Sequence, residues 1–148
     1  MSHTIFHLSF PVTNLDATKQ FYVNGLGCTL GRESHVALTL ELGGHQLVAQ
    51  LCKDLVQQQQ GIYPRHFGLV LDSEAAWQHI RDRAKAHGLK FFREPYRRYS
   101  GKRIEHQTFF LEDPSHNILE FKHYTYESAI FGEHDHATIG DDQERRSP

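Results

Sequence analysis

The chain opens with an alternation of apolar and polar residues over positions 5–12. Successive side chains of a strand point to opposite faces, so this alternation predicts a half-buried strand. Its core face holds Phe6, Leu8 and Phe10. His7 lies on the opposite, open face.

A helix and a small sheet are predicted to follow this strand. Thr13 can cap a helix that begins near Asn14, and Gly25 can end it. Two glycines at 43–44 are typical of a hairpin turn. Three strands are expected around that turn, near 28–33, 36–42 and 45–52.

The same order of elements then recurs. The polar segment 57–64 ends in proline and is predicted to be a linker. A strand is expected at 65–71 and a helix at 73–87, closed by Gly88. Three strands follow, near 89–94, 106–112 and 117–123.

We therefore predict an α+β fold of two βαβββ modules, which share one domain. The first module covers 1–56 and the second covers 65–125. Residues 126–148 are polar and charged, and we expect them to form a mobile tail.

Composition narrows the classes of function. The 148 residues are 39% apolar, enough for a core, and the net charge of −2 does not favour nucleic acid or an anionic membrane. No apolar run could span a bilayer, and no secretory signal is recognisable. Cys28 and Cys52 are too few for a disulfide framework, so we expect buried or partly buried thiols in a cytoplasmic protein.

Polar residues fall on the open faces of four predicted strands. His7 lies on the first strand and His66 at the equivalent point of the second module, while Glu120 lies opposite the core face of the last strand. If these faces curve into a cup, the three side chains converge. Two histidines and a carboxylate suit one divalent Fe, Mn, Ni, Co or Zn ion with open positions. Gln50 can add a fourth ligand or a hydrogen bond to a ligand.

The sequence resembles the vicinal oxygen chelate superfamily, which includes glyoxalase I, bleomycin-resistance proteins and extradiol dioxygenases. The resemblance covers residues 5 to about 124, and it is carried by "HLSFPVTNLDATKQFYVNGLGCTLG", "RHFGLVLD" and "FFLEDPSHNILEF". It implies paired βαβββ modules around a metal, with His7, His66 and Glu120 as its ligands. Gln50 lies where glyoxalase I has an additional ligand. Family analogy also implies a homodimer.

The resemblance is greatest to a bacterial subgroup described as extradiol-type dioxygenases, so ring cleavage of a vicinal diol with Fe(II) is the leading hypothesis. His106 or His45 would then move protons. Phe110 stands where ring-cleaving enzymes have a tyrosine. Two alternatives remain: a glyoxalase-like lyase or isomerase with Ni, Zn or Mn, and a non-catalytic binder of small molecules.

A basic segment at 93–107 is predicted to be a flap near the mouth of the cup. Arg98 and His106 are its candidates for meeting a substrate carboxylate or phenolate, and the other charges of the segment are expected to be solvated. Tyr99, Phe110 and Tyr124 are candidates for lining the same pocket.

Overall fold

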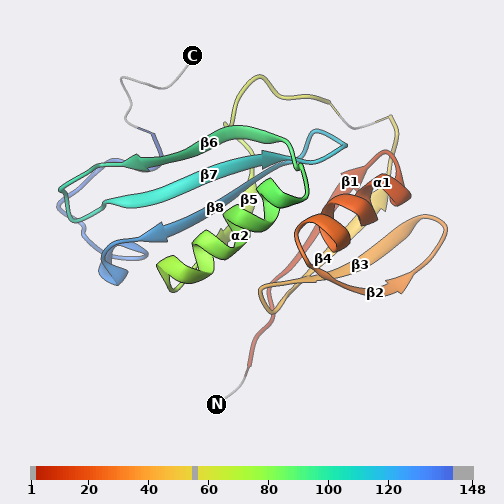
Figure 1. Cartoon of the computed structure of the whole chain (residues 1–148), viewed down its shortest axis with the longest axis horizontal. Coiled ribbons are helices and arrows are strands. Elements are labelled where there is room, and N and C mark those ends of the chain that lie inside the picture. Colours follow the sequence, from red (N-terminus) through yellow and green to blue (C-terminus); the bar gives the residue numbers. More distant parts are fainter. Residues whose placement is uncertain (1–2, 55–56, 142–148) are drawn as a thin grey trace.

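The computed structural model describes residues 3–54 and 57–141, and it confirms two βαβββ units (Figure 1). The first unit consists of β1 (His7–Val12), α1 (Leu15–Lys19), the π-helix η1 (Gln20–Gly25), β2 (Thr29–Glu33), β3 (Ala37–Leu42) and β4 (His45–Leu51). The second consists of β5 (Phe67–Val70), α2 (Glu74–Ala86), β6 (Phe91–Arg98), β7 (His106–Glu112) and β8 (Ile118–Tyr124), followed by the 3₁₀ turn η2 (Glu127–Ala129).

Each unit builds its own four-stranded mixed sheet. The orders are β1-β4-β3-β2 and β5-β8-β7-β6, so the first strand of each unit is an edge strand that pairs in parallel with the last. The remaining neighbours pair antiparallel. This shared topology places β1 and β5 at equivalent positions, as the repeated sequence pattern predicts.

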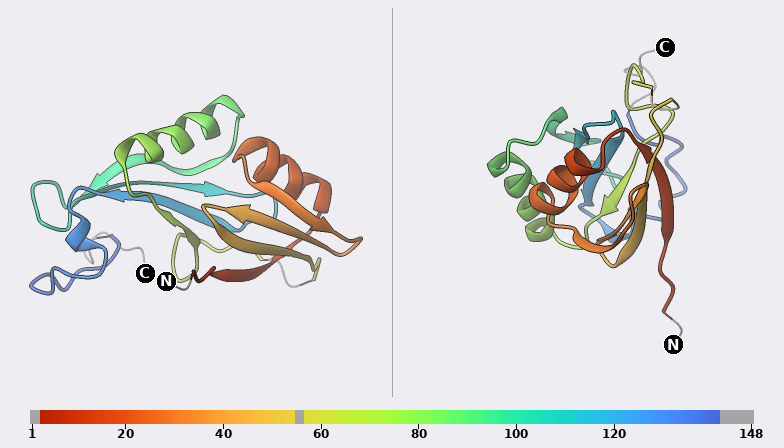
Figure 2. Two further views of the ribbon diagram at one scale, coloured as in Figure 1. Left: turned by 90° about the horizontal axis from the view of Figure 1, so that it is seen from below. Right: turned by 90° about the vertical axis from the view of Figure 1, so that its right-hand side faces the viewer.

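The helices cover one side of both sheets, which leaves the other side for functional groups (Figure 2). Beneath the helices the two units share one core. Phe10 and Phe67 join β1 to β5, with their ring centroids 5.1 Å apart. Trp77 of α2 packs in the same core and donates its indole N–H to the carbonyl of Phe121.

The start of the first helix differs from the prediction. Asn14, rather than Thr13, is the cap, because its side-chain oxygen accepts from the N–H of Ala17. Thr13 instead bonds to Ser115 of the second unit. From Gln20 to Gly25 the helix has π geometry. Tyr22 lies in this wider turn, where its side chain is buried and its hydroxyl donates a hydrogen bond to Asp113 of the second unit.

Two segments without strands cover the open side of the second sheet. Ile62, within the predicted linker, is fully buried against Phe110 and Ile118. Asp141 is also buried, although it belongs to the predicted mobile tail. At Asp141 the chain thus lies against the second sheet; the mobility of the predicted tail stays a prediction, and residues 142–148 lie outside the described part of the chain.

Candidate metal centre

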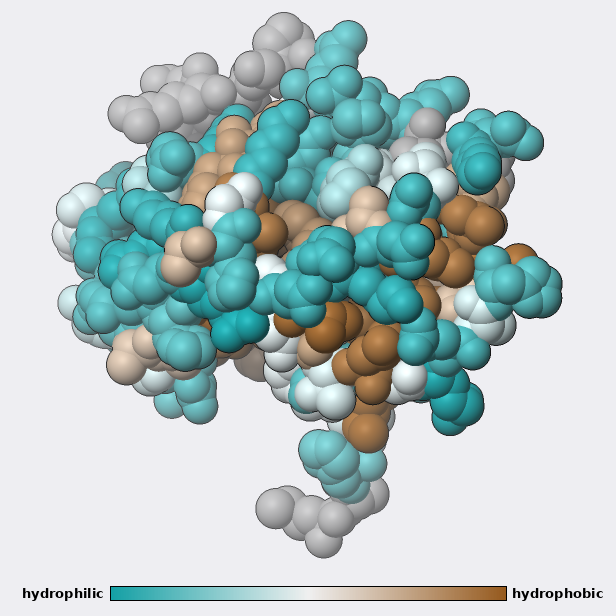
Figure 3. All heavy atoms as spheres, turned by 45° about the vertical axis from the view of Figure 1, so that its right-hand side comes forward, coloured by the Kyte–Doolittle hydropathy of each residue, from teal (hydrophilic) through white to brown (hydrophobic). Residues whose placement is uncertain are grey.

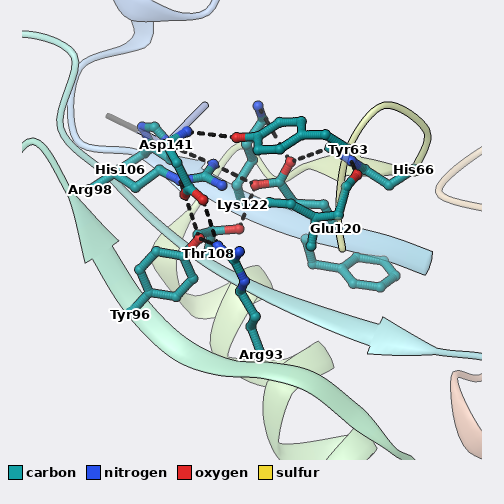
Figure 4. Close-up of polar contacts among 12 residues, drawn as sticks. Tyr63, His66, Arg93, Tyr96, Arg98, His106, Thr108, Glu120, Lys122 and Asp141 are labelled. Carbon is teal, nitrogen blue, oxygen red and sulfur yellow. Dashed lines mark hydrogen bonds and ion pairs between the residues drawn. The ribbon is translucent and has the colours of Figure 1, made fainter. Parts of the chain in front are cut away.

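His66 and Glu120 meet at the edge of the second sheet. His66 immediately precedes β5, and Glu120 lies on its parallel neighbour β8, opposite Gly68. A Cβ atom at Gly68 would overlap the backbone of Glu120, so glycine allows this close approach. His66 Nε2 lies 3.1 Å from Glu120 Oε1 (Figure 4).

The other nitrogen of His66 fixes the state of the ring. His66 Nδ1 lies 2.7 Å from the carbonyl oxygen of Ile62, which can only accept a hydrogen bond, so Nδ1 carries a proton. In a neutral ring Nε2 is then a bare lone pair that faces a carboxylate oxygen. Two acceptors at this distance need a cation between them, either a second proton on the ring or a metal ion.

Glu120 is anionic and buried, with 6% of its surface exposed. Burial alone would raise its pKa. The hydrogen bond with His66, the charge of Lys122, a 2.6 Å hydrogen bond from the Thr108 hydroxyl and the Arg98 guanidinium together lower the pKa to about 2. The carboxylate is therefore ready to hold a cation at neutral pH.

Arg98 links Glu120 to the C-terminal segment. Its Nη1 donates to Glu120 Oε2 at 2.9 Å, and its Nε donates to Asp141 Oδ1 at 2.9 Å. Asp141 also accepts from Arg93 at 2.6 Å and from the Tyr96 hydroxyl at 3.0 Å. The predicted basic segment thus reaches the candidate metal centre through Arg98.

His106 lies beside Arg98 and is buried. Its Nδ1 lies 2.9 Å from the carbonyl oxygen of Ile104, and its Nε2 accepts from Arg98 Nη1 at 3.2 Å. Burial is the main cause that lowers its pKa to about 4, so the ring is neutral at pH 7. Both nitrogens are therefore engaged, and the ring orients Arg98. A role for His106 in proton transfer remains a prediction.

The residues predicted on the first sheet lie elsewhere. His7 is exposed on β1, where its Nδ1 meets the side-chain oxygen of Gln46 at 2.7 Å. Gln50 is exposed on β4, and His45 accepts from the backbone N–H of Phe6. Within residues 3–54 and 57–141, no three His, Cys, Asp or Glu side chains are grouped closely enough to hold a metal. One chain thus brings together His66 and Glu120 but not His7.

The residues predicted to line the pocket lie beside two different histidines, His66 and His106. The ring of Phe110 is fully buried and meets His66 edge-on, with centroids 5.3 Å apart. Tyr124 and Tyr99 instead flank His106, at 4.6 and 6.2 Å. Tyr99 and Arg98 also line a pocket of about 560 Å³.

Sequence reasoning missed Thr108 and Asp141. Thr108 could have been predicted from the sequence, because alternation along β7 puts it on the same face as Phe110, and Phe110 pairs with Glu120 on the neighbouring strand. Asp141 gave no signal, since it is one carboxylate in a polar segment and its arginine partners are more than 40 residues away.

Comparisons with known proteins agree with this architecture. The profile of the Glyoxalase/Bleomycin resistance protein/Dioxygenase superfamily matches residues 4–121. The chain belongs to this superfamily. No curated protein matches it.

No helix in the described ranges is both long and apolar enough to cross a membrane.

Several solved structures share the fold. A glyoxalase/bleomycin resistance protein/dioxygenase from Alicyclobacillus acidocaldarius is 39% identical, with a TM-score of 0.83 over 86% of this chain and 96% of that one. The fosfomycin resistance protein FosX from Listeria monocytogenes is 18% identical, with a TM-score of 0.66 over 87% and 99%. Lactoylglutathione lyase from Agrobacterium tumefaciens is 17% identical, with a TM-score of 0.64 over 88% and 98%. The last two likenesses concern the fold alone.

Proposed function

We propose that this protein is a divalent-metal-dependent enzyme acting on a small molecule, with His66 and Glu120 as two of the metal ligands. The observation that carries the proposal is the approach of His66 Nε2 to the anionic Oε1 of Glu120 at 3.1 Å, a pair that a cation must bridge. Members of the superfamily generally bind a divalent metal. The donor set also fits, because imidazole and carboxylate are common ligands of first-row metals.

The spacing of the two donor atoms agrees with ligation. Ligand atoms roughly 2.1 Å from one ion, at about 90–110° to each other, lie roughly 3.0–3.4 Å apart. The observed 3.1 Å falls in this range. The bond from His66 Nδ1 to the carbonyl of Ile62 is the kind of outer contact that orients a metal-binding histidine.

His7 is the proposed third ligand, supplied by a second copy of the chain. Its Nδ1 contacts the Gln46 side-chain oxygen, so Nε2 faces outward with no partner among the described residues. The side chains of the neighbouring Ile5 and Phe6 are 55% and 61% exposed. Exposed apolar patches of this kind often mark sites of contact with another protein chain. Figure 3 shows apolar side chains gathered on the molecule near the N-terminus. A homodimer would cover them and complete the site.

The first reaction that we propose is extradiol-type cleavage of a vicinal diol with Fe(II). When bound, the iron would supply Lewis acidity to two chelated oxygens and a place for dioxygen. Arg98, buried beside Glu120, would stabilise negative charge that develops on the substrate oxygens. Phe67 and Ile118 line a pocket of about 300 Å³ together with His66, and their side chains offer apolar surface suited to an aromatic ring.

The second reaction that we propose does not use the proton-transfer groups expected for ring cleavage. Phe110 has no hydroxyl, and the Nε2 lone pair of His106 is occupied by Arg98. Neither group is free to take a proton from a diol in this arrangement. A glyoxalase-like lyase or isomerase reaction with Ni, Zn or Mn, in which the ion would polarise a carbonyl, gives no role to Phe110 or His106, although it also needs a base from another side chain.

Metal analysis followed by turnover tests these proposals. The protein is purified without oxygen, and its metal content is measured beside that of Glu120→Gln. About one iron per chain, and oxygen uptake with catechols that the variant lacks, would support ring cleavage. Nickel, zinc or manganese, with turnover of α-ketoaldehyde–thiol adducts, would support the second reaction. No metal after reconstitution would overturn both and leave a ligand-binding protein.

A further inference from the structure

The C-terminal segment delivers a carboxylate into a set of converging donors. Arg98 Nε and the Tyr96 hydroxyl donate to Asp141 Oδ1, and Arg93 Nη1 donates to Oδ2. The backbone N–H of Asp141 donates to the Tyr63 hydroxyl at 2.7 Å. Both carboxylate oxygens are thus held by groups that belong to the second sheet, while Asp141 itself follows the last strand by 17 residues and lies in no regular element (Figure 4).

The surroundings of this carboxylate are strongly cationic. A pocket of about 560 Å³ is lined by Arg93, Arg97, Arg98 and Lys102, and Asp141 is its one acidic lining residue. Arg97 is paired with Glu105 outside the pocket, while Arg93 and Arg98 pair with Asp141 and Arg98 also pairs with Glu120. Without Asp141, the pocket would be a ready site for an oxyanion.

A second observation points to a ligand in the same place. Arg98 is 6% exposed, and its Nη2 is buried with no hydrogen-bond partner in the described part of the chain. Leaving a charged donor unsatisfied is costly in a buried position. A ligand with more acceptor oxygens than one carboxylate could satisfy it.

We propose that Arg93, Tyr96 and Arg98 form a subsite for the carboxylate or phosphoryl group of the substrate, and that Asp141 is a built-in competitor that closes it. The segment around Asp141 then acts as a strap, which an incoming oxyanion must displace. Arg98 also donates a hydrogen bond to Glu120. An anion bound at the subsite would therefore contact the same guanidinium that contacts the candidate metal ligand. The inference deepens the proposed function by naming the charge of the substrate.

Phosphate binding to the metal-free full-length protein tests the strap independently of any metal. Isothermal titration calorimetry at constant ionic strength compares the wild type with Asp141→Ala. We expect phosphate to bind at least tenfold more tightly to the variant. Adding Arg98→Met to the variant should abolish that gain, and adding Arg93→Met should do the same if the first double variant does not fold. Asp135→Ala, which removes an exposed carboxylate of the same segment, should behave as the wild type does.

A second measurement uses the unaltered protein. Displacement of the strap breaks the bond from the Asp141 amide to Tyr63, so saturating phosphate should speed hydrogen exchange of that amide at least fivefold. Equal phosphate affinity in the wild type and Asp141→Ala, or a gain that persists without Arg98, would overturn the proposal. Unchanged exchange of the Asp141 amide under saturating phosphate would also overturn it.

Discussion

Arg98 Nη1 lies 2.9 Å from Glu120 Oε2, and both side chains are almost completely buried. The pair is not isolated, because the same guanidinium also binds Asp141. Two buried carboxylates thus share one buried guanidinium, and a metal is proposed on the far side of Glu120. Charge balance at this point governs both the stability of the second sheet and the chemistry of the site.

Arg98→Met tests that dependence. The substitution keeps much of the apolar volume but removes the buried guanidinium that the two carboxylates share, so it should lower the free energy of unfolding by about 3–5 kcal/mol. Urea denaturation followed by circular dichroism measures the change. Arg97→Met is the matched control, because Arg97 is exposed and its bond to Glu105 should be worth about 1 kcal/mol or less. A loss at Arg98 no larger than at Arg97 would contradict the argument.

His66→Ala should remove the metal while leaving the fold largely intact. His66 is partly exposed and contributes a ligand nitrogen rather than core packing, so we expect occupancy to fall from about one ion per chain to roughly a tenth or less. Elemental analysis of the purified variant gives the result. His79→Ala, on the exposed face of α2, should retain the metal. Full retention in His66→Ala would exclude His66 as a ligand.

Complementation between two inactive variants tests whether His7 comes from a second copy. His7→Ala and His66→Ala are co-expressed with different tags, and the mixed dimer is isolated. If each site takes His7 from one chain and His66 from the other, one of its two sites is intact, so half of the wild-type metal content should return. If one chain builds the whole site, the mixed dimer should hold almost none. Each variant alone should be nearly empty in both cases.

The fold could be predicted from local patterns alone. Alternation along β1 and β8 placed His7 and Glu120 opposite the core faces, although Phe6, expected in the core, is 61% exposed. The helices occupy the expected segments, although Asn14 rather than the expected Thr13 caps the first of them. The repeated order of elements then gave the topology. That topology pairs β5 with β8 in parallel, so the proximity of His66 and Glu120 could also be predicted from the sequence.

The rest of the candidate site depends on contacts that no local pattern encodes. The bonds of Asp141 to Arg93 and Arg98 close a loop of more than 40 residues, and a lone aspartate in a polar segment looks the same whether it is solvated or buried. The isolation of His7 from His66 likewise depends on how two sheets are placed relative to each other. Alternation says which face a residue occupies but not which faces meet.

The buried imidazole of His106 should make the protein sensitive to mild acid. Its pKa is about 4 in the folded protein, against an ordinary value of 6.5, so the unfolded chain binds a proton more readily than the folded one. The stabilising contribution is therefore complete above pH 6.5 and is lost as the pH falls from 6.5 towards 4. By pH 5 this loss should reach about 2 kcal/mol.

His106→Gln isolates this contribution, since glutamine does not titrate. Urea denaturation at pH 7.5 and pH 5 should show the wild type losing about 2 kcal/mol more than the variant. His79→Gln, an exposed control, should retain the pH dependence of the wild type. Equal losses in the wild type and His106→Gln would show that His106 takes up a proton in the folded protein. A protonated ring could no longer accept from Arg98 Nη1, so the orientation of the guanidinium beside Glu120 would then have to come from Glu120 and Asp141 alone.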